Sequence, residues 1–224
     1  MTSTRTEETD PFCLQPLDAA AMLFDAPWHR FAVIGDSLSA GTGDASPGYV
    51  DKGWSDRLAD VLRHIRPDLA YLNTAEDGTT TTQTLEKQIG RAVEFEPDLL
   101  HLPCGANDLV RRTPDFAEIE RNLRRMYELA SETGAQLTTF TLGRAYMIPL
   151  FQDWSERVAR INDITRGLAG EYEAVVVDMW HHPVNDREDL LSEDRIHFST
   201  SGQAVMATEM VKSLSNVLSR TTRA

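Results

Sequence analysis

A serine with the surroundings of a nucleophile lies in the first quarter of the chain. Ser37 follows Gly35 and Asp36 directly after a short apolar run. A serine at such a turn lies near a helix N-terminus, where free N–H groups and the helix dipole favour negative charge. This position suits a nucleophile whose attack creates an oxyanion, although Asp36 and Ser37 are also ordinary helix-capping residues.

A serine nucleophile needs a base, and His197 is the best placed of the six histidines for that role. It lies three residues after Asp194, in the segment Asp194-Arg195-Ile196-His197. On a turn, a carboxylate at this spacing can hold the imidazole Nδ1–H and direct Nε2 outward. The spacing is weak evidence by itself, because an unrelated surface Asp and His show it as well.

Two further loops contain groups that can donate to an oxyanion. Asn107 follows Gly105 and Ala106, and its side-chain amide has two N–H donors. Gly78 lies in the polar segment 73–80, where the missing Cβ lets a backbone N–H approach a substrate closely. In isolation, either loop is also explained by ordinary turn chemistry, since Asn, Asp and Gly are common turn residues.

The elements that must position these residues are five short, nearly continuous apolar segments. Segments between them have apolar residues at helical spacing, so strand and helix alternate along the chain. This pattern predicts an α/β domain over residues 30–224, with a parallel sheet covered on both faces. Residues 1–29 form a separate lead that packs on the domain edge, with a short helix over 17–24. The five predicted strands are residues 30–35, 69–73, 98–104, 136–142 and 174–179.

Polar residues follow these apolar segments, where the sites of open parallel sheets are found. Thr200 and Gln203 also have the spacing of a capping box, which predicts the start of a final helix.

Arg144 and Tyr146 follow the fourth segment and are candidates for lining a substrate pocket, with Arg144 facing a substrate carboxylate. An exposed loop arginine is the simpler interpretation of Arg144.

Taken in chain order, these motifs resemble those of the SGNH (GDSL-type) hydrolase family. The resemblance extends over nearly the whole chain. It implies a flavodoxin-like, three-layer α/β/α fold around a five-stranded parallel sheet, and carboxylic-ester or related acyl chemistry. Four blocks carry it: Gly35-Asp36-Ser37-Leu38, Asn73-Thr74-Ala75-Glu76-Asp77-Gly78, Gly105-Ala106-Asn107-Asp108 and Asp194-Arg195-Ile196-His197.

The resemblance also implies a role for each site residue. Ser37 is then the nucleophile, His197 the general base and later the acid, and Asp194 the carboxylate that orients His197. The N–H groups of Ser37 and Gly78, with the Asn107 amide, would form an oxyanion hole. The implied enzyme is a serine esterase or lipase-like acyl hydrolase that needs no metal or organic cofactor. The same residues would serve an acyltransferase, in which an alcohol or amine replaces water.

Three other classes of function are less well supported. A non-catalytic ligand-binding module would be expected to lack a complete triad. A flavin- or nucleotide-binding protein would need a phosphate loop, and neither a Gly-x-Gly-x-x-Gly nor a Gly-x-x-x-x-Gly-Lys motif is present. A metal site at His181 and His182, with Asp178 or Asp186, is disfavoured because adjacent side chains in an extended loop point apart.

Composition limits the partners of the protein. The 224 residues have a formal net charge of −13, which repels nucleic-acid phosphates and anionic lipid. No apolar run approaches the roughly 20 residues of a membrane span, and residues 1–10 do not resemble a signal peptide. The two cysteines, Cys13 and Cys104, form no disulfide framework. We therefore expect a cytoplasmic enzyme that acts on a small-molecule ester.

Overall fold

The computed structural model describes residues 5–221, and its centre is one five-stranded sheet in which every strand pair is parallel. The strand order β2-β1-β3-β4-β5 places the first strand beside the second and third. All five strands lie within the predicted segments, so the predicted α/β sheet is confirmed. The strands are β1 (Arg30–Val33), β2 (Ala70–Asn73), β3 (Leu99–His101), β4 (Gln136–Phe140) and β5 (Val175–Val177).

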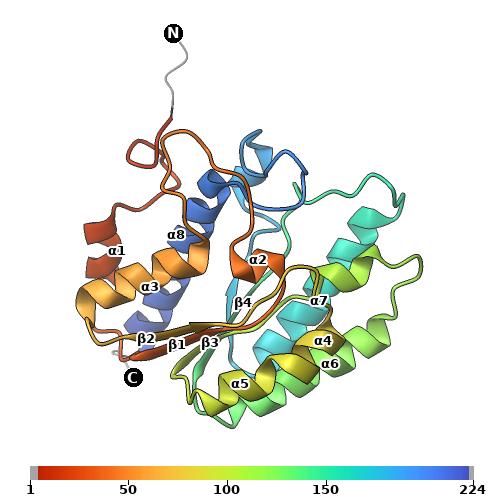
Figure 1. Ribbon diagram of the computed structural model, residues 1–224, viewed down its shortest axis with the longest axis horizontal. Helices are drawn as coiled ribbons and strands as arrows, with labels where there is room; N and C mark the ends of the chain where they lie inside the picture. The colour runs from red at the N-terminus through yellow and green to blue at the C-terminus, as the bar shows by residue number, and fades with distance from the viewer. Residues whose placement is uncertain (1–4, 222–224) are drawn as a thin grey trace.

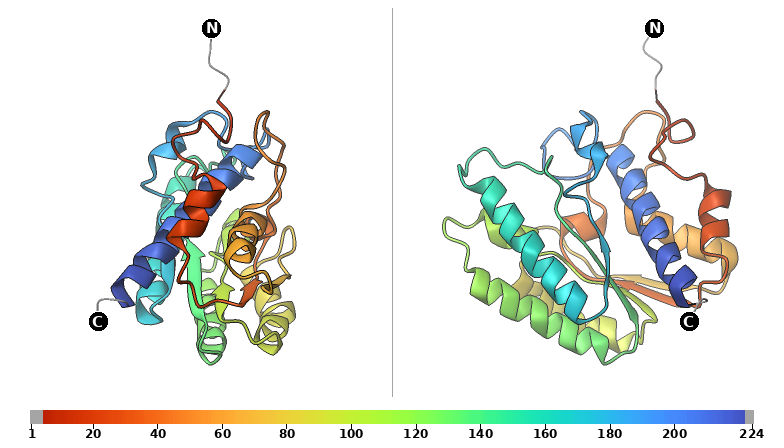
Figure 2. Two further views of the ribbon diagram at one scale, coloured as in Figure 1. Left: turned by 90° about the vertical axis from the view of Figure 1, so that its left-hand side faces the viewer. Right: turned by 180° about the vertical axis from the view of Figure 1, so that it is seen from behind.

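Helices cover both faces of this sheet, which gives the predicted three layers (Figure 1). One face carries α1 (Pro16–Met22), α3 (Trp54–Ile65) and α8 (Thr200–Thr221), and the other carries α4 (Thr81–Lys87), α5 (Ile89–Glu94), α6 (Phe116–Ser131) and α7 (Trp154–Glu171). The view from behind in Figure 2 shows α7 and α8 on opposite sides of the strands. Three short elements lie in loops: α2 (Ser37–Ala40), η1 (Ala106–Val110) and η2 (Pro183–Asp186).

The burial pattern explains why these segments take these conformations. Strand β3 is buried at all three residues, as expected for a strand covered on both faces. In α3, Trp54, Leu58 and Leu62 are almost completely buried and lie four residues apart, which puts them on one helical stripe facing the sheet. Burying each such leucine side chain contributes about 1.5–3 kcal/mol, so apolar patterning is the main determinant of the layers.

The N-terminal segment packs against the same face as α3 and α8. Helix α1 contacts both of these helices, and Ala19 and Leu23 belong to the main hydrophobic core. The backbone N–H of Leu14 donates to Thr208 Oγ1 at 2.9 Å, which joins the segment to α8. The helix begins one residue and ends two residues before the range expected from the sequence. Within residues 5–221, the helices are too short or too polar to cross a bilayer.

The start of α8 corrects one prediction. Thr200 is the first residue of the helix, and the residue before it acts as the cap, because Ser199 Oγ accepts from the Gly202 N–H at 3.3 Å. Gln203 Oε1 instead accepts from the Trp54 N–H at 2.9 Å, and Thr200 Oγ1 accepts from the Ser46 N–H at 2.6 Å. Both side chains thus bind segments that are distant in sequence, because the loops before α3 pack directly on this helix end.

Candidate active site

Ser37 is the first residue of α2, at the carboxyl end of β1. Asp36 caps this helix, and its Oδ1 accepts from the Leu38 N–H at 3.1 Å. Gly35 has φ +143°, and a Cβ there would lie 2.4 Å from Ser39 Oγ, so the turn requires glycine. The three residues of the Gly-Asp-Ser sequence therefore have different roles. Gly35 makes the turn and Asp36 caps the helix, so the Ser37 side chain is not needed as a cap.

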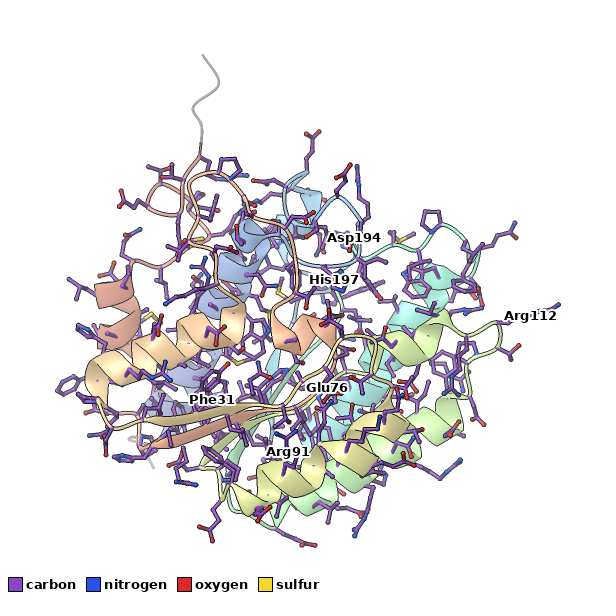
Figure 3. The ribbon with its side chains drawn as sticks, viewed as in Figure 1. Phe31, Glu76, Arg91, Arg112, Asp194 and His197 are labelled. Atoms are coloured by element: carbon purple, nitrogen blue, oxygen red, sulfur yellow. The ribbon has the colours of Figure 1, made fainter. Side chains whose placement is uncertain are left out.

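Ser37, His197 and Asp194 form one hydrogen-bonded chain. Ser37 Oγ lies 2.8 Å from His197 Nε2, and His197 Nδ1 lies 2.6 Å from Asp194 Oδ2. The other Asp194 oxygen accepts from the backbone N–H groups of Ile196 and His197, at 2.8 and 3.0 Å. Figure 3 shows Asp194 and His197 above α2, on the loop that precedes α8. Serine and histidine come together although 160 residues separate them in sequence.

The carboxyl groups of Asp194 and Asp36 have opposite pKa shifts. Partial burial alone would raise the pKa of Asp194, but hydrogen bonds from the Ile196 and His197 N–H groups and from the His197 ring outweigh it and lower the pKa. Complete burial raises the pKa of Asp36 to about 6, and its hydrogen bond from Leu38 offsets only part of that rise. Asp194 therefore stays charged beside the imidazole as pH falls below neutrality, whereas Asp36 gains a proton as pH falls through about 6.

The loops with Gly78 and Asn107 are joined to each other beside the nucleophile turn. Asn107 Nδ2 donates to the Thr79 carbonyl at 3.1 Å, which occupies one of its two N–H donors. The Glu76 N–H and the Thr79 hydroxyl donate to the Gly35 carbonyl at 3.1 and 3.3 Å, two residues before Ser37. Gly78 is exposed with φ +75°, and a Cβ there would meet nothing within 4 Å. The loop therefore requires glycine for its backbone conformation and not for space within the protein.

The two predicted pocket residues after β4 have different surroundings. Tyr146 is 6% exposed and lines a small apolar pocket with Leu38 and Ile196, the neighbours in sequence of Ser37 and His197. Arg144 is exposed, and its Nε donates to the Trp180 carbonyl at 3.1 Å. Of the two, Tyr146 is thus the residue that the fold brings next to the segments that carry Ser37 and His197.

Two other groups near the site, Asp108 and Cys104, have a structural explanation. Both Asp108 oxygens bind Thr81, at 2.8 Å from its N–H and 3.0 Å from its hydroxyl, so this carboxylate holds the start of α4. Cys104 is 2% exposed, and burial raises the pKa of its thiol well above the usual value. A thiol that stays protonated at neutral pH is a poor nucleophile, so Cys104 does not compete with Ser37.

His181 and His182 point to different partners. His181 Nδ1 lies 2.9 Å from Asp178 Oδ2 on an exposed surface. His182 Nδ1 accepts from the Val184 N–H at 3.1 Å, and its Nε2 lies 3.5 Å from Glu209. The two rings therefore do not converge on one point, as the sequence argument on adjacent side chains predicts.

Sequence reasoning missed Arg157, which holds two loops at this edge of the sheet. Its side chain is 8% exposed and donates to the carbonyls of Leu109, Arg111 and Arg112 at 2.7–3.2 Å. The guanidinium also lies 4.4 Å from the centre of the Phe151 ring, in the loop after β4. The sequence does contain a signal for a buried arginine. Arg157 falls on the same helical stripe of α7 as the apolar core residues Trp154 and Ile161.

Comparisons with known proteins place the chain in a family. A model of the GDSL-like lipase/acylhydrolase family matches residues 33–205. An arylesterase of Vibrio mimicus is 26% identical over 208 residues, which cover 91% of this chain and 95% of that protein. The chain therefore belongs to the GDSL-like lipase/acylhydrolase family and is a carboxylic ester hydrolase.

Several solved structures have the same fold. The psychrotrophic esterase EstA from Pseudoalteromonas sp. superposes with a TM-score of 0.68 at 20% identity, covering 85% of this chain and 99% of that one. TesA gives 0.65 at 21% identity, covering 83% and 97%. The acetylxylan esterase Axe2 from Geobacillus stearothermophilus gives 0.65 at 19% identity, covering 83% and 93%. At these identities the similarity establishes the three-layer fold.

Proposed function

We propose that the protein hydrolyses carboxylic esters through an acyl-enzyme formed on Ser37. One observation carries the proposal, the hydrogen-bonded chain of Ser37 Oγ, His197 and Asp194 with distances of 2.8 and 2.6 Å. A nucleophile within hydrogen-bond distance of a base, itself oriented by a carboxylate, is the arrangement that nucleophilic catalysis requires. The placement of Ser37 at a helix N-terminus adds a favourable field for the developing oxyanion.

In the first half of the reaction, Ser37 Oγ attacks the ester carbonyl carbon while His197 Nε2 takes the hydroxyl proton. The Asp194 carboxylate stabilises the imidazolium that forms. The carbonyl oxygen becomes an anion, which accepts hydrogen bonds from the N–H groups of Ser37 and Gly78 and from the Asn107 N–H that Thr79 does not use. The intermediate then expels the alcohol, which receives its proton from His197.

In the second half, water replaces the alcohol and the same groups act again. His197 takes a proton from the attacking water, the oxyanion forms at the same donors, and the carboxylic acid leaves as Ser37 recovers its proton. An alcohol or amine acceptor in place of water would make the protein an acyltransferase. Activity on aryl esters, measured with and without alcohol acceptors, separates the two reactions.

The Vibrio mimicus relative suggests the first substrates to test, and the two cysteines suggest the compartment. Because the Vibrio mimicus relative is an arylesterase, aryl esters are the appropriate first substrates. Both Cys13 and Cys104 are free thiols, which suits the reducing cytoplasm.

A fluorophosphonate probe tests the nucleophile. We expect one adduct, on Ser37, and loss of both labelling and p-nitrophenyl acetate turnover in Ser37→Ala. The matched control is Ser39→Ala, because Ser39 is also buried on α2 and its hydroxyl has no hydrogen-bond partner among the described residues. Labelling at Ser39, or full turnover by Ser37→Ala, would contradict the proposal.

A further inference from the structure

His197 and Asp194 lie on a hairpin-like loop, residues 189–199, which we call the histidine loop. The Ser192 N–H donates to the His197 carbonyl at 2.8 Å, and the Ser199 N–H donates to the Leu190 carbonyl at 3.1 Å. Leu191 and Phe198 form an antiparallel bridge between the two arms. Because the arms are paired, the position of the base of this loop determines where His197 meets Ser37.

Arg187 holds the two ends of the base together. Its Nε lies 3.2 Å from Asp189 Oδ1 at the start of the histidine loop, and its Nη2 lies 3.1 Å from Ser201 Oγ just after the end. The hydroxyls of Ser199 and Ser201 donate to the Asp189 carbonyl at 2.5 and 2.6 Å. A planar guanidinium presents its donors in a fixed fork and can hold both groups in one geometry, whereas the donors of an ammonium rotate freely.

Arg187 is itself anchored on the N-terminal segment by Asp10. Its Nη1 lies 2.7 Å from Asp10 Oδ2, and the two side chains are 9% and 0% exposed. Asp10 also accepts from the Tyr49 hydroxyl at 2.7 Å and from the Phe12 N–H at 2.9 Å. Burial alone would raise the pKa of Asp10, but these two hydrogen bonds and the charge of Arg187 outweigh it and lower the pKa. The pair is therefore ionised at neutral pH.

A second ion pair ties the N-terminal segment to the same region. Arg5 Nη2 lies 2.6 and 2.5 Å from the two Asp189 oxygens, so Asp189 is contacted by arginines from both sides. Figure 2 shows the N-terminal segment running beside the loop before α3 and the start of α8. The N-terminal residues thus act on the histidine loop, although the family match begins only at residue 33.

We propose that Arg187 is a positioning residue that sets His197 and Asp194 against Ser37, and that Asp10 is its anchor. The proposal rests on the proposed function of Ser37 and His197. The side-chain hydrogen bonds of Arg187 reach Asp10, Tyr49, Asp189 and Ser201, and none of these is a reacting group. The network therefore acts through the geometry of the histidine loop.

The decisive variant is the double substitution Asp10→Asn with Arg187→Met, because it removes both charges of the buried pair and so leaves neither of them unpaired. We expect kcat to fall about 10- to 100-fold with KM little changed, since a small displacement of a catalytic group has an effect of this size. Labelling of Ser37 by the fluorophosphonate probe should slow to a similar degree. Arg187→Lys keeps the charge without the planar fork and should recover only part of the rate.

A matched control uses another ion pair of the same segment. Arg57 on α3 pairs with Glu7, and the other side-chain hydrogen bonds of this pair go to the backbone of Val50 and Lys52. The double variant Glu7→Gln with Arg57→Met therefore loosens the same N-terminal segment without removing a contact to the histidine loop. We expect this control to lower the melting temperature while kcat stays at the wild-type value. Amide hydrogen exchange should rise in residues 190–198 of the Asp10/Arg187 variant and not in the control.

Two outcomes would overturn the proposal. One is a folded Asp10/Arg187 double variant with wild-type kcat and wild-type exchange in the histidine loop. The other is an equal loss of kcat in the Glu7/Arg57 control, which would indicate general loosening. The Ser37→Ala variant separates this result from a failure of the proposed function: if it keeps turnover, the assignment of Ser37 is wrong, whatever Arg187 does.

Discussion

Replacing Asn107 by alanine separates a catalytic role of its amide from a purely structural one. The amide has two N–H donors, and the structure shows one of them bound to the Thr79 carbonyl at 3.1 Å. Losing that neutral hydrogen bond should cost about 0.5–1.5 kcal/mol of unfolding free energy. For a chain of this size, a loss of 1 kcal/mol lowers the melting temperature by about 2–4 °C.

The second donor carries the larger effect if it binds the oxyanion. Removing one such donor lowers kcat by about 10²–10³-fold, or roughly 2.7–4 kcal/mol of transition-state stabilisation. KM should change little, because the contact strengthens only as charge develops. Asn107→Asp should be at least as damaging, since an ionised carboxylate repels the oxyanion.

Melting temperature, kcat and KM must be measured on one preparation of each variant. Asn122→Ala is the matched control, because the Asn122 amide on α6 donates to the hydroxyls of Thr81 and Thr82 at 3.3 and 2.9 Å and lies outside the oxyanion loops. It should lose similar stability while kcat is kept. A folded Asn107→Ala variant with wild-type kcat and KM would refute the reasoning and remove Asn107 from the mechanism.

Three further predictions test other parts of the structure. The folded-state pKa of Asp36 is about 6, above its unfolded value of about 4. The wild-type protein therefore loses stability as pH rises from about 4 to 6. Asp36→Asn does not have this loss, so its free energy of unfolding relative to wild type should rise by up to ~3 kcal/mol across that window and stay constant above it. Thermal unfolding at several pH values measures this, and a gain independent of pH would contradict it. Arg157→Met should lower the free energy of unfolding by about 1.5–3 kcal/mol in denaturant titrations. Arg166 lies on the same helix, but its partners are the exposed carboxylates of Asp163 and Asp178, so Arg166→Met should cost no more than about 1 kcal/mol. EDTA should leave ester hydrolysis unchanged; a rate lost to EDTA and restored by zinc would instead support a metal site at His181 and His182.

The sequence by itself determined the layers of the fold and the set of candidate site residues. The five apolar segments predict the five strands because strands covered on both faces must be apolar at nearly every position. The helical spacing of residues such as Trp54, Leu58 and Leu62 predicts which stripe faces the sheet. Once the strands are parallel, their carboxyl ends share one edge, so Ser37 and Asn107 are expected at the same edge from local pattern alone.

The tertiary structure alone decided which side chains meet, and at what distance. His197 comes within 2.8 Å of Ser37 although the two lie 160 residues apart, and the loop that carries His197 is paired with itself between Leu190 and Ser199. The same packing diverts Gln203 from the expected capping box to the Trp54 N–H. It also buries Asp36 until its pKa reaches about 6. Burial, charge pairing and contacts between residues distant in sequence depend on how the layers pack, and local residue patterns carry no information on that packing.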